Sequence, residues 1–172
     1  MTNIIGGSGN DILLGGGGND SLLGEEGYDI LNGGAGNDYL YGGNFERDMY
    51  VFNAGHGQDV VSDMAANPNK VIFWLSKTIK VMNCGLVITA IDLIISHLGT
   101  TDQVTVKNWY LTDYCRQYCI TTADGKEIFA SQIQQLVNAM SSFSSDSQNI
   151  PSIDEQKMLF NQQSIISSYW GN

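Results

Sequence analysis

The chain has 172 residues, a formal net charge of −10 and a hydrophobic content of 42%. Such an acidic chain lacks the basic surface that nucleic acids require, and we expect no direct binding to nucleic acid or to anionic membranes. Three cysteines, an odd number, exclude a fully paired disulfide framework. The longest apolar run, 86–98, is too short to span a bilayer and contains Asp92 and His97.

Negative charge and glycine are concentrated in the first third of the chain. Residues 1–63 contain ten acidic side chains and one basic one, a net charge of −9, whereas 64–172 contain eight and seven, a net charge of −1. Sixteen of the 20 glycines precede residue 64. A compact fold of such an acidic segment needs cations to offset the repulsion between its carboxylates. The composition therefore predicts a cation-binding segment followed by a nearly neutral one.

The acidic segment consists of nine-residue repeats that begin at Gly6. Four copies follow in phase: GGSGNDILL, GGGGNDSLL, GEEGYDILN and GGAGNDYLY. Each copy has glycine at position four, aspartate at position six and leucine at position eight. Two degenerate copies follow at 43–51 and 54–62, with Asp48 and Asp59 at position six. A flexible glycine-rich linker would not keep aspartate and leucine in phase, so we interpret the repeats as structural units.

Each position of the repeat has a physical reason. Glycine permits the positive φ angles of a sharp turn. Aspartate and inward-facing carbonyls supply the oxygen ligands that calcium prefers, about six to eight per ion. The last three residues are typical of a short strand, in which position eight faces a core. The pattern G-G-x-G-x-D-x-U-x resembles the calcium-binding nonapeptide of repeat-in-toxin proteins. This resemblance implies a mainly β fold, a right-handed parallel β-roll with two repeats in each turn.

The resemblance also implies which residues hold calcium. In similar rolls, one loop supplies the carbonyls of positions one and three, the loop two repeats later supplies those of positions two and four, and both supply aspartate. Two sites are well specified here, and up to two more depend on the degenerate repeats. The first site joins Gly6, Ser8 and Asp11 to Glu25, Gly27 and Asp29; the second joins Gly15, Gly17 and Asp20 to Gly34, Gly36 and Asp38; the third joins Gly24, Glu26 and Asp29 to Asp48; and the fourth joins Gly33, Ala35 and Asp38 to Gly55, Gly57 and Asp59.

After a roll at 1–63, residues 64–143 are predicted to form a β-rich capping region that ends in a helix. Apolar, β-branched or alternating segments at 71–75, 86–95 and 103–110 indicate strands, and 123–126 has the composition of a hairpin turn ahead of 127–129. DQVTVKNWY, ADGKEI and IQQLVNAMSSF resemble the region after the repeats in many secreted repeat-in-toxin proteins, including haemolysin-type ones. Because a solenoid needs its apolar end covered, we expect Trp74, Trp109 and Tyr110 to pack there.

The C-terminal part of the chain is predicted to contain two helices. The first covers 131–143, with Ser131 and Gln134 as a capping box, and the second follows Pro151. Residues 144–172 read as a polar linker and an amphipathic helix, which the resemblance implies to be a type I secretion signal. The two histidines, His56 and His97, lack the spacing of metal ligands and are interpreted as isolated residues that are structural or exposed.

The sequence therefore predicts a calcium-binding module of a larger secreted bacterial protein, with a toxin-like parent that type I machinery exports and that folds when it meets calcium outside the cell. No Ser/His/Asp set, HExxH motif or phosphate loop is present, so we expect no enzymatic activity. The alternative is an adhesin or lectin-like module, in which the cap offers an exposed aromatic surface that includes Trp109. The parent protein's activity and the oligomeric state stay open at this point.

Overall fold

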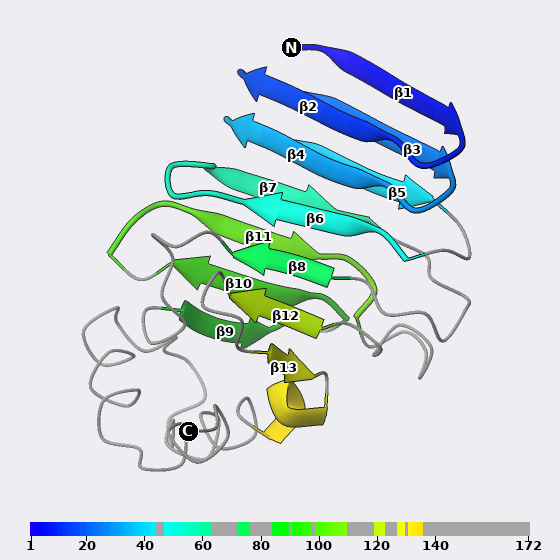
Figure 1. The fold of residues 1–172 in the computed structure, drawn as a ribbon. Coiled ribbons are helices and arrows are strands. Elements are labelled where there is room, and N and C mark those ends of the chain that lie inside the picture. Colours follow the sequence, from blue (N-terminus) through cyan, green and yellow to red (C-terminus); the bar gives the residue numbers. More distant parts are fainter. Residues whose placement is uncertain are drawn as a thin grey trace.

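The structure, a computed structural model, contains two β-sheets (Figure 1). It describes residues 1–43, 47–62, 72–75, 84–89, 91–97, 99–109, 119–122, 127–129 and 131–135. One sheet has the order β1 (Asn3–Ser8), β3 (Ser21–Glu26), β5 (Tyr39–Gly43), β7 (Gln58–Val61), β11 (Gln103–Val106), β10 (Leu93–His97), β9 (Cys84–Ile88). The other has the order β13 (Glu127–Phe129), β12 (Cys119–Thr122), β8 (Ile72–Leu75), β6 (Met49–Phe52), β4 (Ile30–Ala35), β2 (Ile12–Gly17).

The chain alternates between the two sheets, so each of the first six strands pairs with the strand two elements later. All of these pairs are parallel, and in the regular repeats the register steps by two nonapeptides, from Ile4 to Leu22 and from Leu22 to Leu40. On the other sheet, Leu13 is the partner of Leu31 in the same way. The repeat length therefore sets the height of one turn, and the predicted mainly β fold, a parallel β-roll, is confirmed.

The core of the roll lies between the sheets and is filled by position eight of the repeats. Successive side chains of a strand point to opposite faces, so position eight is enclosed while positions seven and nine face outward. Ile12 and Leu14 are accordingly 70% and 64% exposed on either side of Leu13. Each buried leucine contributes about 2 kcal/mol relative to an exposed one. The six position-eight residues are all buried: Leu13, Leu22, Leu31, Leu40, Tyr50 and Val61.

Both sheets continue past the last repeat. Strand β8 pairs in parallel with β6, β11 with β7, and β12 with β8. Antiparallel pairs then end each sheet, β9 and β10 in one and β13 in the other. The capping region is thus joined to the repeats by main-chain hydrogen bonds, and Trp109 is buried with it.

The run 86–95 forms two antiparallel strands, β9 and β10, with a turn between Ile88 and Leu93. In this turn the Thr89 N–H donates to the Asp92 carbonyl. The Asp92 carboxylate accepts from Lys107 Nζ at 2.8 Å and from the Asn108 N–H at 2.9 Å, and this anchor to the segment after β11 holds Asp92 in the turn. Residues 131–135 are helical, within the predicted first helix. The rest of that helix, the second helix and the predicted secretion signal lie outside the described residues.

None of the helices among the described residues has the length and the apolar composition to cross a bilayer.

Candidate calcium-binding loops

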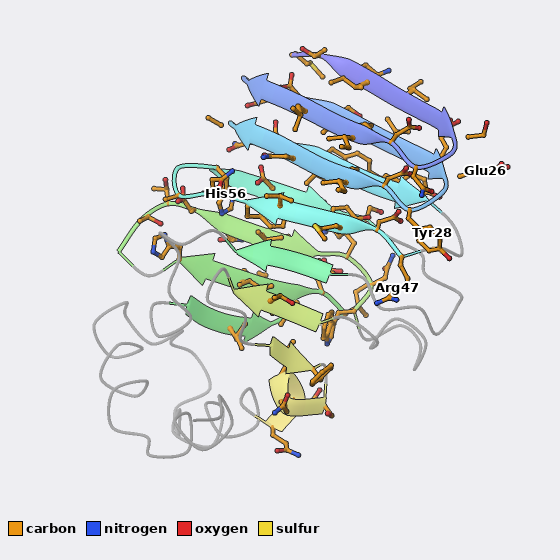
Figure 2. The ribbon with its side chains drawn as sticks, in the orientation of Figure 1. Glu26, Tyr28, Arg47 and His56 are labelled. Carbon is orange, nitrogen blue, oxygen red and sulfur yellow. The ribbon has the colours of Figure 1, made fainter. Side chains whose placement is uncertain are left out.

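The loops between strands form two stacks at opposite edges of the sheets. The first stack contains 9–11, 27–29 and 47–48, and the second contains 18–20, 36–38 and 53–57. Figure 2 shows this separation, with Tyr28 and Arg47 at one edge and His56 at the other. Because two repeats make one turn, repeats n and n+2 lie directly above each other, as all four predicted pairings require.

A ladder of main-chain hydrogen bonds orients the position-six aspartates. In each case the Oδ1 atom of one aspartate accepts from the main-chain N–H of the position-six residue two repeats earlier. One carboxylate oxygen is therefore held by the fold, and the other is left to face the interior of the loop. The donor and acceptor pairs are Asp11 and Asp29 at 2.8 Å, Asp29 and Asp48 at 3.0 Å, Thr2 and Asp20 at 2.6 Å, Asp20 and Asp38 at 2.8 Å, and Asp38 and Asp59 at 2.9 Å.

The second oxygen, Oδ2, is buried in the regular repeats without a hydrogen-bond donor. This is the situation of Asp11, Asp20 and Asp38. Asp20 and Asp38 are only 3% and 2% exposed, so solvent does not replace the missing donor. A buried, unsatisfied charged oxygen costs several kcal/mol, on the order of the stability of a small domain. Among the described residues, none of these three oxygens has a hydrogen-bond donor; the N-terminal amino group lies 3.8 Å from the other oxygen of Asp20.

Main-chain carbonyls converge on the same space as these carboxylate oxygens. A Cβ atom built on Gly6 would lie 2.7 Å from Asp11 Oδ2 and 2.9 Å from the Gly24 carbonyl oxygen. At Gly15 the corresponding neighbours are Asp20 Oδ2 and the Gly33 carbonyl oxygen. Two acceptors that face each other repel unless a cation lies between them, and a mixture of carboxylate and carbonyl oxygens is the ligand set of calcium.

Two main-chain carbonyls that were not predicted for the first and second sites lie close to them. The position-one carbonyls of Gly24 and Gly33 approach the aspartates of the first and second sites, whereas the resemblance had placed these residues in the third and fourth. The Glu26 and Ala35 carbonyls already accept hydrogen bonds, from the N–H groups of Gly9 and Gly18, both at 2.8 Å. Among the described residues, no group of three or more His, Cys, Asp or Glu side chains is placed to hold a metal ion.

The electrostatics of the second stack favour a cation. Burial raises the pKa of Asp38 above its ordinary value, and the neighbouring charges of Asp59 and Asp20 act in the same direction. The hydrogen bond from the Asp20 N–H and the proximity of His56 oppose this effect without cancelling it. The metal-free loops therefore hold the Asp38 carboxylate in its charged form at a cost, which a divalent ion removes.

Glycine is required where the stacked loops approach most closely. Gly34 has a φ of +100°. A side chain on Gly34 would collide with the main chain of Gly16 in the loop below. Glu25 occupies the same position two in the third repeat and has a φ of +79°, which costs a non-glycine residue about 1–3 kcal/mol.

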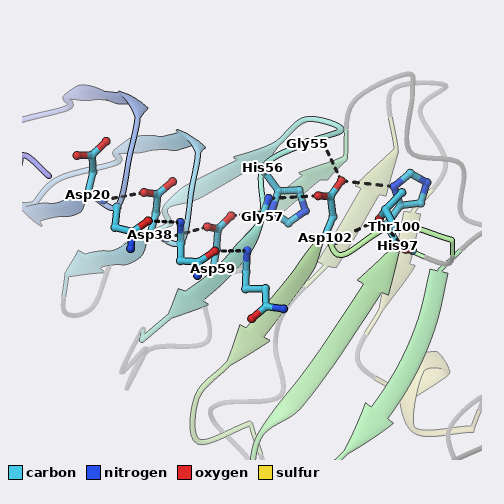
Figure 3. Close-up of polar contacts among 12 residues, drawn as sticks. Asp20, Asp38, Gly55, His56, Gly57, Asp59, His97, Thr100 and Asp102 are labelled. Atoms are coloured by element: carbon cyan, nitrogen blue, oxygen red, sulfur yellow. Dashed lines mark hydrogen bonds and ion pairs between the residues drawn. The ribbon is translucent and has the colours of Figure 1, made fainter.

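The degenerate repeats differ from the regular ones. In the fifth, Asp48 is 1% exposed, and the Tyr50 hydroxyl accepts from the Gly42 N–H at 2.8 Å; 44–46 lie outside the described residues. In the sixth, His56 Nδ1 lies 2.7 Å from Asp59 Oδ2 (Figure 3). The prediction that His56 is isolated was wrong. Its spacing of three residues from Asp59 was the available signal.

A second polar cluster at the sixth repeat, around Asp102, was not predicted because its members are far apart in the sequence. The Asp102 carboxylate accepts from the Gly55 N–H at 2.7 Å and from the Gly57 N–H at 3.2 Å (Figure 3). His97 Nδ1 lies 3.7 Å from Asp102 Oδ2, so His97 is not isolated either. Burial acts to raise the pKa of Asp102, but the two main-chain donors and the nearby imidazoles hold it below its ordinary value.

The alternative prediction of an exposed aromatic ligand surface on the cap depended on Trp109, which is buried. Trp109 is 1% exposed and is therefore a core residue that cannot stack on a carbohydrate ring. The exposed aromatic side chains among the described residues are Tyr28, Tyr39 and Phe129, which lie on different strands and loops.

The fold and the stacked acidic loops define a calcium-binding β-roll, and comparison with known families gives the same class. The RTX calcium-binding nonapeptide repeat (4 copies) matches residues 3–31 and 14–45. The haemolysin-type calcium binding protein related domain matches residues 92–128, which include the DQVTVKNWY and ADGKEI segments. The chain therefore carries repeat-in-toxin nonapeptides followed by a haemolysin-type related domain, and its repeats imply calcium as their ligand.

Other comparisons add little. No curated protein matches the chain. The solution structure of the AlgE6R3 subunit from the Azotobacter vinelandii mannuronan C5-epimerase is similar over 88% of this chain and 86% of that chain, at 17% identity and a TM-score of 0.46. This similarity is too weak to bear on activity.

Proposed function

We propose that the stacked loops bind calcium at the four inter-repeat sites and that calcium holds the regular repeats together. The observation that carries this proposal is the set of buried Oδ2 atoms without donors on Asp11, Asp20 and Asp38. The glycine, serine, alanine and glutamate ligands contribute carbonyls, and the six position-six aspartates contribute charge. Calcium itself supplies the positive charge that lets the carboxylates lie one above another.

The energetics make calcium decisive for folding. Extracellular calcium modules have dissociation constants of about 10⁻⁴–10⁻³ M. At a free calcium concentration about tenfold higher, each site adds about 1.4 kcal/mol. Three or four sites then add about 4–6 kcal/mol, which is comparable to the whole stability of a small domain. Without calcium, the net charge of −9 in 1–63 opposes the compact roll.

In the cell, this dependence suits a protein that is exported unfolded. We propose that the chain is a non-enzymatic module of a larger, toxin-like bacterial protein, that type I machinery secretes it, and that it folds in extracellular calcium. The matches to the repeat-in-toxin and haemolysin-type families support this role, as does the confinement of the acidic charge to the repeats. Cytosolic calcium is too scarce to fill sites of such affinity.

Calcium titration of the chain tests the proposal. Isothermal titration gives the number of ions bound, and far-ultraviolet circular dichroism in calcium, in magnesium and in chelator gives the β content. We expect binding of more than one calcium ion and loss of β signal in chelator, with no recovery in magnesium. Asp20→Asn should remove at least one bound ion. Glu26→Gln, which changes an exposed side chain at the end of β3 and keeps the main-chain carbonyl, should remove none. A full β spectrum in chelator with no calcium bound would refute the proposal.

A further inference from the structure

Asp59, the position-six aspartate of the sixth repeat, has a side-chain partner for Oδ2, which Asp11, Asp20 and Asp38 do not have. The Oδ2 atoms of Asp11, Asp20 and Asp38 are buried without a donor, whereas Asp59 Oδ2 lies 2.7 Å from His56 Nδ1. The two side chains are 4% and 1% exposed. Because an ionised carboxylate only accepts hydrogen bonds, the Nδ1 atom carries the proton and donates it. At the sixth repeat, the imidazole N–H thus provides the positive partner that we propose a cation provides in the regular repeats.

The imidazole is held in this position by its surroundings. The Phe52 ring centroid lies 5.2 Å from that of His56 with an interplanar angle of 56°, and Phe52 is 1% exposed. The packing leaves His56 little freedom to turn away from Asp59. A buried pair of this kind is costly to break, because Asp59 Oδ2 is then left without a donor while Oδ1 keeps the bond from the Asp38 N–H.

The aspartate ladder also ends above the sixth repeat. Strand β11 is in register with β7, and it places Val104, which is 2% exposed, beside Asp59. A valine can supply neither a charge nor an acceptor. The carboxylate at this turn comes from Asp102, two residues earlier, and it binds the Gly55 and Gly57 N–H groups rather than facing another carbonyl. Figure 3 shows Asp20, Asp38 and Asp59 in a row, with His56 and Asp102 at its end.

We propose that His56 takes the place of a calcium ion at the last level of the second stack, and that His56 and Asp102 together close this stack without metal. The inference rests on calcium binding by the loops below. No calcium then lies between the sixth repeat and β11, because His56 already donates to Asp59 Oδ2. Removal of the imidazole leaves Asp59 Oδ2 buried and unpaired, like the oxygens of the regular repeats, and so creates a further calcium site.

Calcium stoichiometry of the whole chain tests the inference with three variants. His56→Gly removes the donor, His56→Asn keeps an amide N–H at the position of Nδ1, and His97→Ala removes an imidazole that is not bonded to a ladder aspartate. We expect His56→Gly to bind one more calcium ion per chain than the unmodified protein. His56→Asn and His97→Ala should bind the same number as the unmodified protein. Equal numbers for the unmodified chain and His56→Gly would overturn the inference, and an unmodified chain without bound calcium would instead refute the proposed function.

A second measurement decides the matter if His56→Gly does not fold. Hydrogen exchange in chelator reports on the Gly55 and Gly57 amides of the unmodified chain. If the last turn closes without metal, these amides remain at least about 100-fold protected relative to an unfolded chain. Exchange at the rate of an unfolded chain would show that this turn depends on calcium as the regular repeats do, and would overturn the inference.

Discussion

The regular repeats and the turn after the sixth repeat are built on the same backbone, but they satisfy their buried carboxylates differently. In the loops at 18–20 and 36–38, Oδ1 of the aspartate accepts from a main-chain N–H and Oδ2 has no donor. At the sixth repeat both oxygens of Asp59 have partners, because the Asp38 N–H donates to Oδ1 and His56 donates to Oδ2. On the proposed function, the regular region depends on an external cation, whereas Asp59 has its partner within the chain.

Position six of the repeat is therefore not by itself sufficient for a calcium site. Asp20, Asp38 and Asp59 accept the same kind of main-chain hydrogen bond, and we propose that the group facing the second oxygen decides whether the aspartate binds calcium. Three further experiments test this difference between the two regions.

The largest expected effect is the loss of hydrogen-exchange protection in the regular region when calcium is removed. The Asp11 and Asp20 amides, which donate to Asp29 and Asp38, should lose about 1000-fold protection, as expected from about 4 kcal/mol contributed by three sites. The β10 and β11 amides in the other region should lose less than about tenfold. Exchange followed by nuclear magnetic resonance in calcium and in chelator measures both. Equal losses would show that the two regions unfold as one unit.

A smaller effect is expected from alanine at position two of the repeat. Gly34 and Gly55 have φ angles of +100° and +82°, but a Cβ on Gly34 meets the Gly16 main chain, and one on Gly55 meets nothing within 4 Å. Gly34→Ala should lower the free energy of unfolding by about 3 kcal/mol or more, and Gly55→Ala by about 1 kcal/mol, because only the first adds a collision to the backbone strain. Urea denaturation in saturating calcium measures the difference, and similar costs would contradict the close stacking of the regular loops.

The smallest effect concerns Asp92, whose partners lie in the capping region. Burial acts to raise its pKa, but the bonds from Lys107 and Asn108 hold it below the ordinary value of 3.8. The carboxylate therefore adds stability above about pH 4, and this contribution is lost as the pH falls through the lower pKa of the folded state. Lys107 is 44% exposed, so Asp92→Asn should cost only about 1 kcal/mol at pH 7 and little near pH 3.

A change of calcium concentration is the control for the Asp92→Asn prediction. The cost of Asp92→Asn should be the same at saturating calcium and at a tenfold lower concentration, because no calcium loop contacts Asp92. Thermal denaturation at pH 7 and pH 3 under both conditions measures it. A cost that changes with calcium would mean that the Asp92 anchor and the loops are coupled.

Much of the site followed from the repeat itself. A nonapeptide with glycine at position four, aspartate at six and leucine at eight predicts short strands and tight loops, and the roll stacks loops 18 residues apart as expected. The run 86–95 was harder, because nothing local in its apolar residues marks the break at Asp92. That break is anchored by Lys107 and Asn108, which both lie in the turn after β11.

The nonapeptide pattern was sufficient to predict the class of the fold, calcium as the ligand and the position of each aspartate, because these depend on local turn geometry and on a repeat that stacks equivalent residues. The partners of the second carboxylate oxygens became evident only in the folded structure. Asp102 reaches Gly55 and Gly57 across more than 40 residues, and Val104 ends the ladder only because β11 is in register with β7. Such contacts depend on the length of the chain between β7 and β11 and on how these two strands pair, and no local sequence pattern encodes either.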